Sequence, residues 1–379
     1  MSLVSVILPA YNQARYLGAA IDSVLGQTYA ELELIVVNDG STDATPDVIR
    51  TYQDPRLRYV EQENRGLSAA RNAGLNGAWG RFVTFLDADD LFLPGKLTDL
   101  LGAMTADADV GLAAGQALPI DEHGHQVGRP FDRGLPADPG DLLFGNPLHV
   151  GSVLLRRSWL DRVHPFDESL RSYEDWDLWL RLARAGCPMR WVDKPVSLYR
   201  FHTHQMTRDG GQMTTASMMV LDKVFGDPAP PESWLRRRPR AYSEAHLRAA
   251  ANAYLAGEIE SGQQHLRQAV DLQPGLLADQ GRPLADRFSA WTELPKTSDP
   301  IAFLETIYRH LPSGLAVLRR RRREEIGRVA LRLAFDSYRQ GDWDETRASL
   351  RQVLRLRPAW LARRGVASIF VRTHLSTLN

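Results

Sequence analysis

Three aspartates, Asp87, Asp89 and Asp90, stand within four positions directly after a run of apolar residues. Like charges this close together raise one another's pKa unless a cation or a hydrogen-bond donor compensates them. Proteins hold Mg²⁺ and related hard cations with one or two carboxylates and the phosphates of a substrate. Asp87 and Asp89 flank a single small residue, so the pattern predicts a cation site at the end of a strand. The alternative is a solvated acidic turn that caps the helix expected near Leu93.

The first 110 residues alternate short apolar runs with helical patterns. Four runs rich in β-branched and aromatic residues are predicted to be strands buried on both faces. These strands are expected over residues 4–10, 32–39, 57–62 and 81–87, and helices over residues 14–27, 45–53, 67–75 and 93–104. Such a series favours an α/β fold with a parallel sheet covered by helices. Ligands bind these sheets beyond the carboxyl ends of the strands.

Polar and aromatic residues gather where the predicted strands end or in the loops that follow them. They are Pro9, Ala10, Tyr11, Asp39, Arg65, Arg71 and Asp87. Together they suit a nucleoside diphosphate, with the base on the aromatic ring, Asp39 on a base N–H, and arginine and a cation on the phosphates. Taken singly, Tyr11 and Arg71 are also compatible with ordinary core or surface packing.

Five stretches, in order, resemble glycosyltransferase family 2, whose enzymes have the GT-A fold, a Rossmann-like mixed sheet. They are residues 5–29, 33–45, 64–75, 85–90 and 174–186, and the resemblance covers roughly residues 3–208. It implies transfer of a sugar from a nucleotide-diphosphate donor, UDP by default, with inversion at the anomeric carbon. The roles it implies are Pro9, Tyr11 and Asp39 on the base, Arg71 near the base or phosphates, Asp87 at the ribose and Asp89 on the metal.

Inverting transfer needs a base that takes the proton of the acceptor hydroxyl, and Glu174 and Asp175 are the candidates. They stand at the start of a predicted amphipathic helix over residues 173–186. Carboxylates at such a place are also plain helix-start residues, stabilised by the helix dipole. The dipole lowers a carboxyl pKa, so a base here needs burial to compensate. The resemblance favours Asp175 as the catalytic base, with Glu174 in reserve.

A histidine after the last strand-like segment completes the metal site in many enzymes of the resembled fold. This indicates His202, with His204 as the alternative, and Mn²⁺ or Mg²⁺ as the cofactor. The Q-x-x-R-W motif of the processive members is absent, which favours a non-processive enzyme. Trp176 and Trp179 recur on one stripe of the predicted helix, so core positions are expected, although either ring could stack on an acceptor sugar.

Two domains joined by a linker are expected. Residues 1–225 would form the GT-A domain, the proline-rich residues 226–240 the linker, and residues 241–379 an α-helical domain. In this last part, residues 253–277 and 337–361 align without gaps and resemble the helix-turn-helix of a tetratricopeptide repeat. Two such units are fewer than an array usually needs, so we expect them to pack on the intervening helices rather than form an open groove.

The composition is that of an ordinary soluble protein, with 44% hydrophobic and 24% charged residues. The formal net charge of +0 gives no overall bias toward nucleic acid, and the single cysteine, Cys187, excludes an internal disulfide. The chain starts without a signal-peptide pattern and has no apolar stretch long enough to span a bilayer. A cytoplasmic location is therefore expected.

Arginine is concentrated toward the C-terminus, with 15 arginines against 6 aspartates and glutamates over residues 311–379. The densest run is LRRRRREE, residues 318–325. One interpretation is a solvated helix face, or pairing with acidic groups of the same protein. Another is attraction to anionic phospholipid, at about 1 kcal/mol per basic residue, which would hold the protein at the inner face of the membrane. A partner protein is a third, whereas nucleic acid is not expected because no aromatic residues interleave the arginines.

The acceptor is expected to be a glycan or a lipid-linked saccharide, chosen by the irregular residues 115–150, where residues 121–134 are predicted to form a mobile loop. Two other classes of function stay open. One is an inactive GT-A-like scaffold that binds partners through its helical repeats, against which the intact acidic residues speak. The other is a sugar-phosphate nucleotidyltransferase, although residues 9–17 lack the glycine- and arginine-rich loop of that class.

Overall fold

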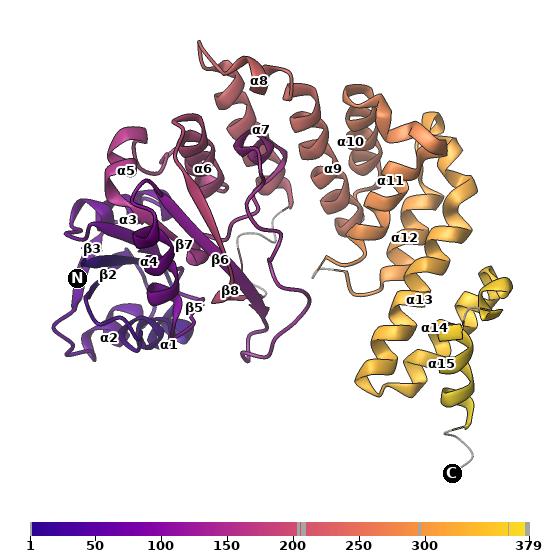
Figure 1. Ribbon diagram of the computed structural model, residues 1–379, viewed down its shortest axis with the longest axis horizontal. Helices are drawn as coiled ribbons and strands as arrows, with labels where there is room; N and C mark the ends of the chain where they lie inside the picture. The colour runs from indigo at the N-terminus through magenta and orange to yellow at the C-terminus, as the bar shows by residue number, and fades with distance from the viewer. Residues whose placement is uncertain (1, 203–204, 206–209, 295–296, 363, 376–379) are drawn as a thin grey trace. The chain divides into compact units, whose positions relative to one another are not determined.

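The computed structural model describes residues 2–202, 205, 210–294, 297–362 and 364–375. The chain divides into two compact units, Met1–Ala245 and His246–Asn379. Figure 1 shows that the first unit combines a sheet with helices and that the second is built from helices.

The first unit is built on an eight-stranded sheet with the strand order β3-β2-β1-β4-β7-β6-β8-β5. The four strands on one side are parallel and match the four expected from the sequence. They are β1 (Val4–Ala10), β2 (Leu32–Asp39), β3 (Leu57–Gln62) and β4 (Phe82–Phe85). Because these strands are parallel, their carboxyl ends meet at one edge of the sheet, as the sequence predicts.

The prediction that these strands are buried on both faces is confirmed for three of them and is wrong for β3. Every residue of β1, β2 and β4 is buried, whereas the residues of β3 are partly or fully exposed. The reason is position, since β3 is the edge strand and pairs only with β2.

Helices cover both faces of the parallel half. The side chains of Val4, Val6 and Leu8 point to one face, where they pack on α1 (Ala14–Leu25), α2 (Thr45–Arg50) and α4 (Lys96–Ala106). Ile7 points to the other face, which is covered by α3 (Leu67–Asn76), α5 (Arg157–Val163), α6 (Glu174–Arg184) and α7 (Gly210–Gly226). Alternate residues of a strand point to opposite faces, which explains this division.

The other half of the sheet is mixed. It contains β5 (Leu91–Phe92), β6 (Leu112–Ile120), β7 (Val153–Arg156) and β8 (Met189–Arg200), with the 3₁₀ turns η1 (Pro139–Phe144) and η2 (Val150–Ser152) between β6 and β7. β7 is antiparallel to both β4 and β6, while β6 and β8 are parallel. β6 pairs with β7 only over its first three residues and then continues beside β8. Beyond Ala114, the edge of β6 that faced β7 is paired with residues that follow β6, through the bridges Ala117–Phe131 and Ile120–Gln126.

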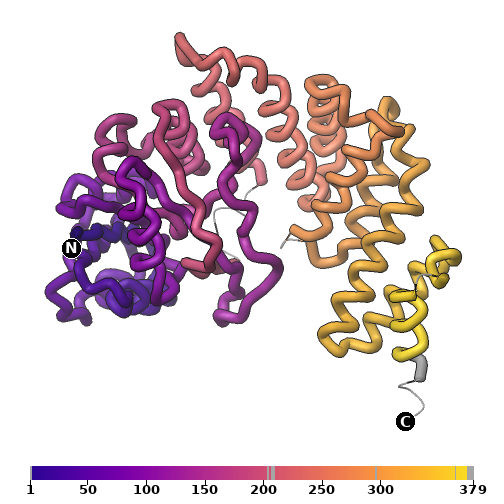
Figure 2. The backbone as a smooth tube through the Cα atoms, viewed as in Figure 1, coloured from indigo at the N-terminus to yellow at the C-terminus, as the bar shows by residue number. Residues whose placement is uncertain are grey.

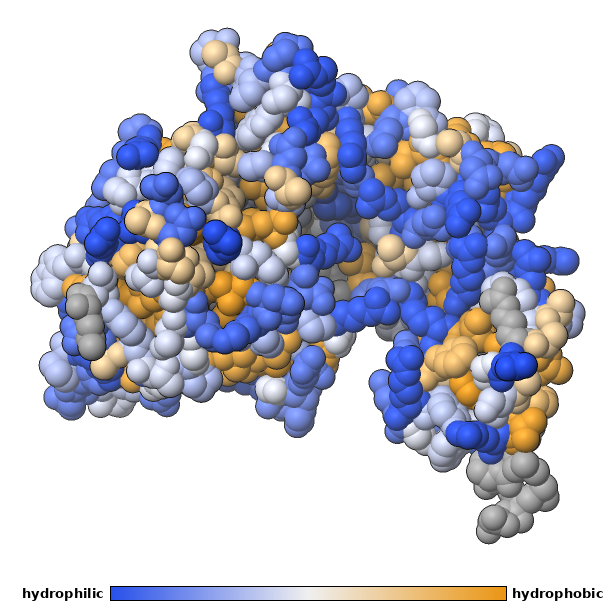
Figure 3. Space-filling view, viewed as in Figure 1, coloured by the Kyte–Doolittle hydropathy of each residue, from blue (hydrophilic) through white to orange (hydrophobic). Residues whose placement is uncertain are grey.

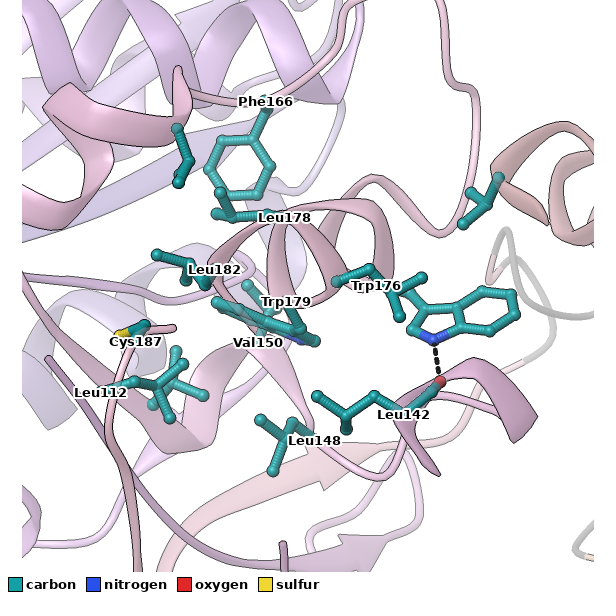
Figure 4. Packing of buried hydrophobic residues seen from close by; sticks show 14 of the residues in the cluster. Leu112, Leu142, Leu148, Val150, Phe166, Trp176, Leu178, Trp179, Leu182 and Cys187 are labelled. Atoms are coloured by element: carbon teal, nitrogen blue, oxygen red, sulfur yellow. Dashed lines mark hydrogen bonds between the residues drawn. The ribbon is translucent and has the colours of Figure 1, made fainter. Parts of the chain in front are cut away.

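Trp176 and Trp179 of α6 are fully buried, so the expectation that they belong to the core is confirmed. Figure 4 shows both rings among leucine side chains, with the indole N–H of Trp176 donating to the carbonyl oxygen of Leu142 at 2.7 Å. Neither tryptophan is placed to stack on an acceptor.

The second unit contains most of α9 (Arg238–Ala256) and the helices that follow. They are α10 (Ile259–Leu272), η4 (Pro274–Leu277), α11 (Ala278–Trp291), α12 (Pro300–Arg309), η5 (Ser313–Arg321), α13 (Arg322–Gln340), α14 (Trp343–Leu356), η6 (Pro358–Ala362) and α15 (Arg364–Leu375). Across the described parts of both units, every helix is too short or too polar to cross a membrane.

The two sequence repeats occupy equivalent places in this unit. Gly257 and Gly341 follow α9 and α13 with φ of 77° and 78°, a conformation that only glycine adopts without strain. Pro274 and Pro358 begin the equivalent turns η4 and η6. The first repeat shares one buried cluster with α11, α12 and α13, so it packs on the intervening helices as the sequence predicts.

The residues expected to form the linker contain α8 (Glu232–Leu235) and the first turn of α9. Trp234 is buried in the same cluster as α6 and α7. The two compact units therefore divide inside a helix, after Ala245, rather than at the proline-rich stretch.

Candidate active site

Tyr11 lies at the carboxyl end of β1 and is 47% exposed. Asn12, which follows it, has φ of 52°, an uncommon value for a residue other than glycine. The Asn12 side-chain oxygen accepts from the backbone N–H of Thr42 at 2.8 Å, and its backbone N–H donates to Ser41 Oγ at 3.0 Å. These bonds join the loop after β1 to the loop after β2 directly beside Tyr11. Pro9 is buried in β1.

Asp39 ends β2 and shapes the loop in front of α3. Its carboxylate is buried and accepts from Gln62 Nε2 at 2.7 Å and from the backbone N–H groups of Arg65 and Gly66 at 2.9 and 2.8 Å. A carboxylate offers about four acceptor positions, so one is left for a ligand. The guanidinium of Arg65 points elsewhere and pairs with Glu168 at 2.9 Å. Ala10 is buried in β1.

Arg71 on α3 is 1% exposed and lies between two carboxylates. Its Nη2 is 2.5 Å from Asp87 Oδ1, and its Nη1 donates to Glu174 Oε1. Burial opposes the charged form, but the two carboxylates outweigh it and raise the pKa of Arg71. One permanent charge therefore connects α3, the segment after β4 and the start of α6.

Asp175 follows Glu174, is partly exposed and lines a pocket. Its carboxylate accepts from Asn146 Nδ2 at 2.8 Å and from the backbone N–H of Trp176 at 2.7 Å. Burial raises the pKa of Asp175 to about 7, Glu174 adds to the rise, and Arg71 opposes it. Burial thus outweighs Arg71 and the two hydrogen bonds that favour the carboxylate, and a carboxyl group of this pKa suits a general base near neutral pH.

Asp89 and His202 are in contact, with 2.8 Å between Asp89 Oδ2 and His202 Nε2. They lie far apart in the chain and come from the segment after β4 and the segment after β8. Among the described residues, no group of three acidic, histidine or cysteine side chains is arranged to hold a metal. A carboxylate and an imidazole fit a cation such as Mn²⁺ that takes its remaining ligands from a diphosphate. His204 lies outside the described residues.

Asp90, the third aspartate of the motif, is fully buried and has different partners. Its Oδ1 accepts from the backbone N–H of Arg200 at 2.8 Å, and its Oδ2 lies 3.0 Å from His149 Nε2. Burial raises the pKa of Asp90 to about 7, and His149 acts against that rise. The three acidic groups are therefore compensated separately, Asp87 by Arg71, Asp89 by His202 and Asp90 by His149.

A pocket of about 280 Å³ brings together part of this set, whereas Tyr11, Asp39, Asp89 and His202 are not among the residues that line it. The residues that line it include Arg71, Asp87, Glu174 and Asp175, together with Phe131, Asn146, His149, Tyr173 and Tyr199. The second group was not found from the sequence. Its members are single residues in irregular segments or at strand and helix ends, where no spacing pattern marks them. A positive φ of 59° at Tyr173 is visible only in the folded chain.

Comparisons with known proteins bear on the family and the fold of this chain. Residues 5–133 match the family described as Glycosyl transferase family 2. The succinoglycan biosynthesis protein ExoO of Rhizobium meliloti is 33% identical over 248 residues, which are 62% of this chain and 68% of ExoO. The chain belongs to glycosyltransferase family 2. An uncharacterized glycosyltransferase of Rickettsia felis is 33% identical over 213 residues, 54% of this chain and 35% of that protein. The chain spans about a third of the length of the first curated relatives it matches.

A solved structure supports the fold. The mannosyltransferase PcManGT of Pyrobaculum calidifontis, in complex with GDP-Man and Mn²⁺, superimposes with a TM-score of 0.53 at 21% identity, covering 81% of this chain and 86% of PcManGT. The predicted fold class, a GT-A domain followed by an all-α domain, is confirmed.

Replacing Arg71 tests how much the buried charge contributes. Arg71→Met should lower the free energy of unfolding by about 3–5 kcal/mol, because Glu174 would be left buried without its partner. Urea unfolding followed by tryptophan fluorescence measures the loss. In the double variant Arg71→Met/Glu174→Gln we expect part of the stability to return, since the unpaired charge is gone. The control is Arg65→Met, whose exposed ion pair contributes about 0–1 kcal/mol. Equal losses in the two single variants would contradict this account.

Proposed function

We propose that this chain transfers a sugar from a nucleotide-diphosphate donor to a hydroxyl group of a glycan or lipid-linked saccharide, with inversion at the anomeric carbon. The reaction would depend on a divalent cation and add one sugar per event. The observation that carries this proposal is the carboxyl group of Asp175, whose pKa is raised to about 7 in the pocket that also contains Asp87 and Arg71.

The donor nucleotide would occupy the carboxyl ends of β1, β2 and β4. The exposed ring of Tyr11 would stack on the base, and the remaining acceptor position of Asp39 would take a base N–H. Asp87, held at 2.5 Å by Arg71, would accept from the ribose hydroxyls. UDP stays the default donor nucleotide, and GDP is the other prominent candidate because PcManGT is in complex with GDP-Man.

In the chemical step, Asp175 would take the proton of the acceptor hydroxyl as its oxygen forms a bond to the anomeric carbon. The bond between that carbon and the diphosphate oxygen breaks on the opposite face, and the electron pair leaves with the diphosphate. Asn146 and the backbone N–H of Trp176 orient the carboxylate of Asp175. Glu174 acts through Arg71 as a positioning residue, because its own carboxylate is buried in the ion pair.

A divalent cation held by Asp89 and His202 would neutralise the charge that develops on the departing diphosphate. The protein's own contribution is to keep these two side chains together. Arg200 supports them by donating from Nε to the carbonyl oxygen of Asp89 at 2.8 Å.

The transfer rate should rise with pH through about pH 7, because only the carboxylate form of Asp175 can accept a proton and its pKa lies there. Asp175→Asn should lower kcat by about 10²- to 10⁴-fold, the usual contribution of a general base. Initial rates between pH 5 and 9 measure both effects, with thermal unfolding to check that the variant is folded. Asp161→Asn, an exposed position on α5, is the charge-matched control. A flat pH profile together with a fully active Asp175→Asn would show that another group is the base.

Cation-dependent nucleotide binding is the second test. We expect one nucleotide among UDP, GDP, dTDP and CDP to raise the melting temperature when Mn²⁺ or Mg²⁺ is present. Saturation at 100 times Kd stabilises a folded protein by about 2.7 kcal/mol. Asp89→Ala should lose the cation-dependent part of the shift, and a chelator should remove it from the wild-type chain. A shift that is the same with and without cation would contradict the metal site.

The nucleotide panel and a pyrophosphate-release assay separate the other two classes of function. A chain that responds to none of the nucleotides would favour the inactive scaffold. Release of pyrophosphate from a nucleoside triphosphate and a sugar phosphate would favour the nucleotidyltransferase.

The arginine-rich region pairs largely within its own unit. Arg322 contacts Glu305 at 3.3 Å, Arg328 contacts Glu324 at 2.5 Å, and Arg332 contacts Glu293. These pairs support the intramolecular interpretation for the residues involved.

Arg319, Arg320 and Arg323 are exposed, and we infer that they attract an anionic membrane surface. Figure 3 shows hydrophobic residues on the surface of the same unit. Leu361 and Val371 are two exposed large hydrophobic side chains of this unit.

Vesicle co-sedimentation tests this attraction. Changing all three exposed arginines to glutamine should weaken binding to phosphatidylglycerol-containing vesicles roughly hundredfold, since each basic residue contributes about 1 kcal/mol. Pure phosphatidylcholine vesicles and a buffer of high ionic strength are the controls. Unchanged binding by the triple variant would exclude these residues as the contact.

A further inference from the structure

The chain folds back on itself after β6. Residues 121–131, here called the return segment, run antiparallel to the part of β6 that has left β7 (Figure 2). The backbone N–H of Phe131 donates to the carbonyl oxygen of Ala117 at 2.8 Å, and that of Val127 donates to Pro119 at 2.9 Å. The sequence predicts a mobile loop here, whereas the structure bonds the segment to the sheet at both ends.

The turn that begins the return segment is fastened to the cation-site residues. The Asp121 carboxylate accepts from the backbone N–H groups of His123 and His125, both at 2.9 Å. Arg200 Nη1 donates to the carbonyl oxygens of Asp121 and Glu122 at 3.1 and 3.3 Å. The same guanidinium donates to the carbonyl oxygen of Asp89. One buried arginine therefore sets the position of both segments.

The return segment delivers an aromatic ring to the pocket. Phe131 is 39% exposed and meets Tyr199 edge to face, with 5.7 Å between ring centroids. Tyr199 in turn packs on His149 with a centroid distance of 4.6 Å. All three rings line the pocket that contains Asp175. Such a wall suits a pyranose ring, whose C–H face is apolar and whose hydroxyl edge needs polar partners.

The strand order indicates which sugar this wall would meet. The nucleotide residues follow β1, β2 and β4, on one side of the sheet, while Phe131 and Tyr199 belong to the β6–β8 side. Asp175 lines the same pocket as both Asp87 and the aromatic wall. Because the base takes a proton from the acceptor, the acceptor ring belongs on the side of Asp175 away from the nucleotide.

We propose that Phe131 and Tyr199 form the subsite for the sugar ring of a saccharide acceptor, and that the return segment determines which acceptor is used. This inference rests on the proposed function and names the substrate class of the same site.

The test uses the full chain with the donor identified from the nucleotide panel. The acceptor probes are octyl β-glycosides of glucose, galactose, mannose and N-acetylglucosamine, and a serine-containing peptide serves as a hydroxyl acceptor without a sugar ring. Phe131→Ala should raise the KM for the preferred glycoside about tenfold. It should leave the nucleotide-induced thermal shift unchanged. Phe131→Trp should keep the KM within about threefold, because it retains an aromatic face.

Trp79→Ala is the matched control. Trp79 is 70% exposed and precedes β4, so it lies at the amino ends of the parallel strands, whereas the proposed site lies beyond their carboxyl ends. It should leave the KM unchanged. A Phe131→Ala variant with an unchanged KM for the glycoside would overturn the proposal. Wild-type transfer to the peptide but to none of the glycosides would overturn it as well, and so would donor hydrolysis without transfer to any probe. If the wild-type chain neither binds a nucleotide nor hydrolyses a donor, the proposed function itself fails.

Discussion

The guanidinium of Arg71 is removed from water and lies between carboxylates from two separate parts of the chain, Asp87 after β4 and Glu174 at the start of α6. Taking these charges out of water is costly, and only close pairing offsets that cost. The two ion pairs of Arg71 therefore hold α6 close to the end of β4. Asp175 inherits its position from this arrangement because it is the next residue after Glu174. The residue that we propose as the general base is thus placed by an ion pair formed by its neighbour.

The acidic motif at residues 87–90 follows the same logic. Each of the three aspartates has its own partner, and these come from α3, from the segment after β8 and from the turn before β7. Arg200 adds bonds to the backbone of Asp89 and to the side chain of Asp90. The partners come from different elements, but Asp89 and Asp87 still contribute to the raised pKa of Asp90. Asp89 and Asp90 each contact a histidine, and Asp90 is the one that is fully buried.

The parallel half of the sheet could be predicted from the sequence because buried strands and their helices leave periodic patterns. The partial exposure of β3 could not be predicted, because an apolar run does not reveal that a strand has a neighbour on one side only. The candidate residues Asp39, Asp87, Asp89 and Asp175 were found because they stand at the ends of periodic segments. His149, Phe131 and Tyr199 were missed because their importance comes from contacts across the fold. The raised pKa of Asp175 could not be predicted either. Burial causes it, and burial is a property of the packed pocket.

The end of the return segment that carries Phe131 is attached to β6 through a backbone hydrogen bond, which does not depend on the side chain at that position. Its fold can therefore persist while the residue at the position of Phe131 changes. The residues that we propose for the donor follow other strands, so they would be untouched by such changes. If the proposed sites are right, a stretch exchanged between related chains would carry acceptor preference with it. Selection on the acceptor and selection on the donor would then act on different parts of one polypeptide.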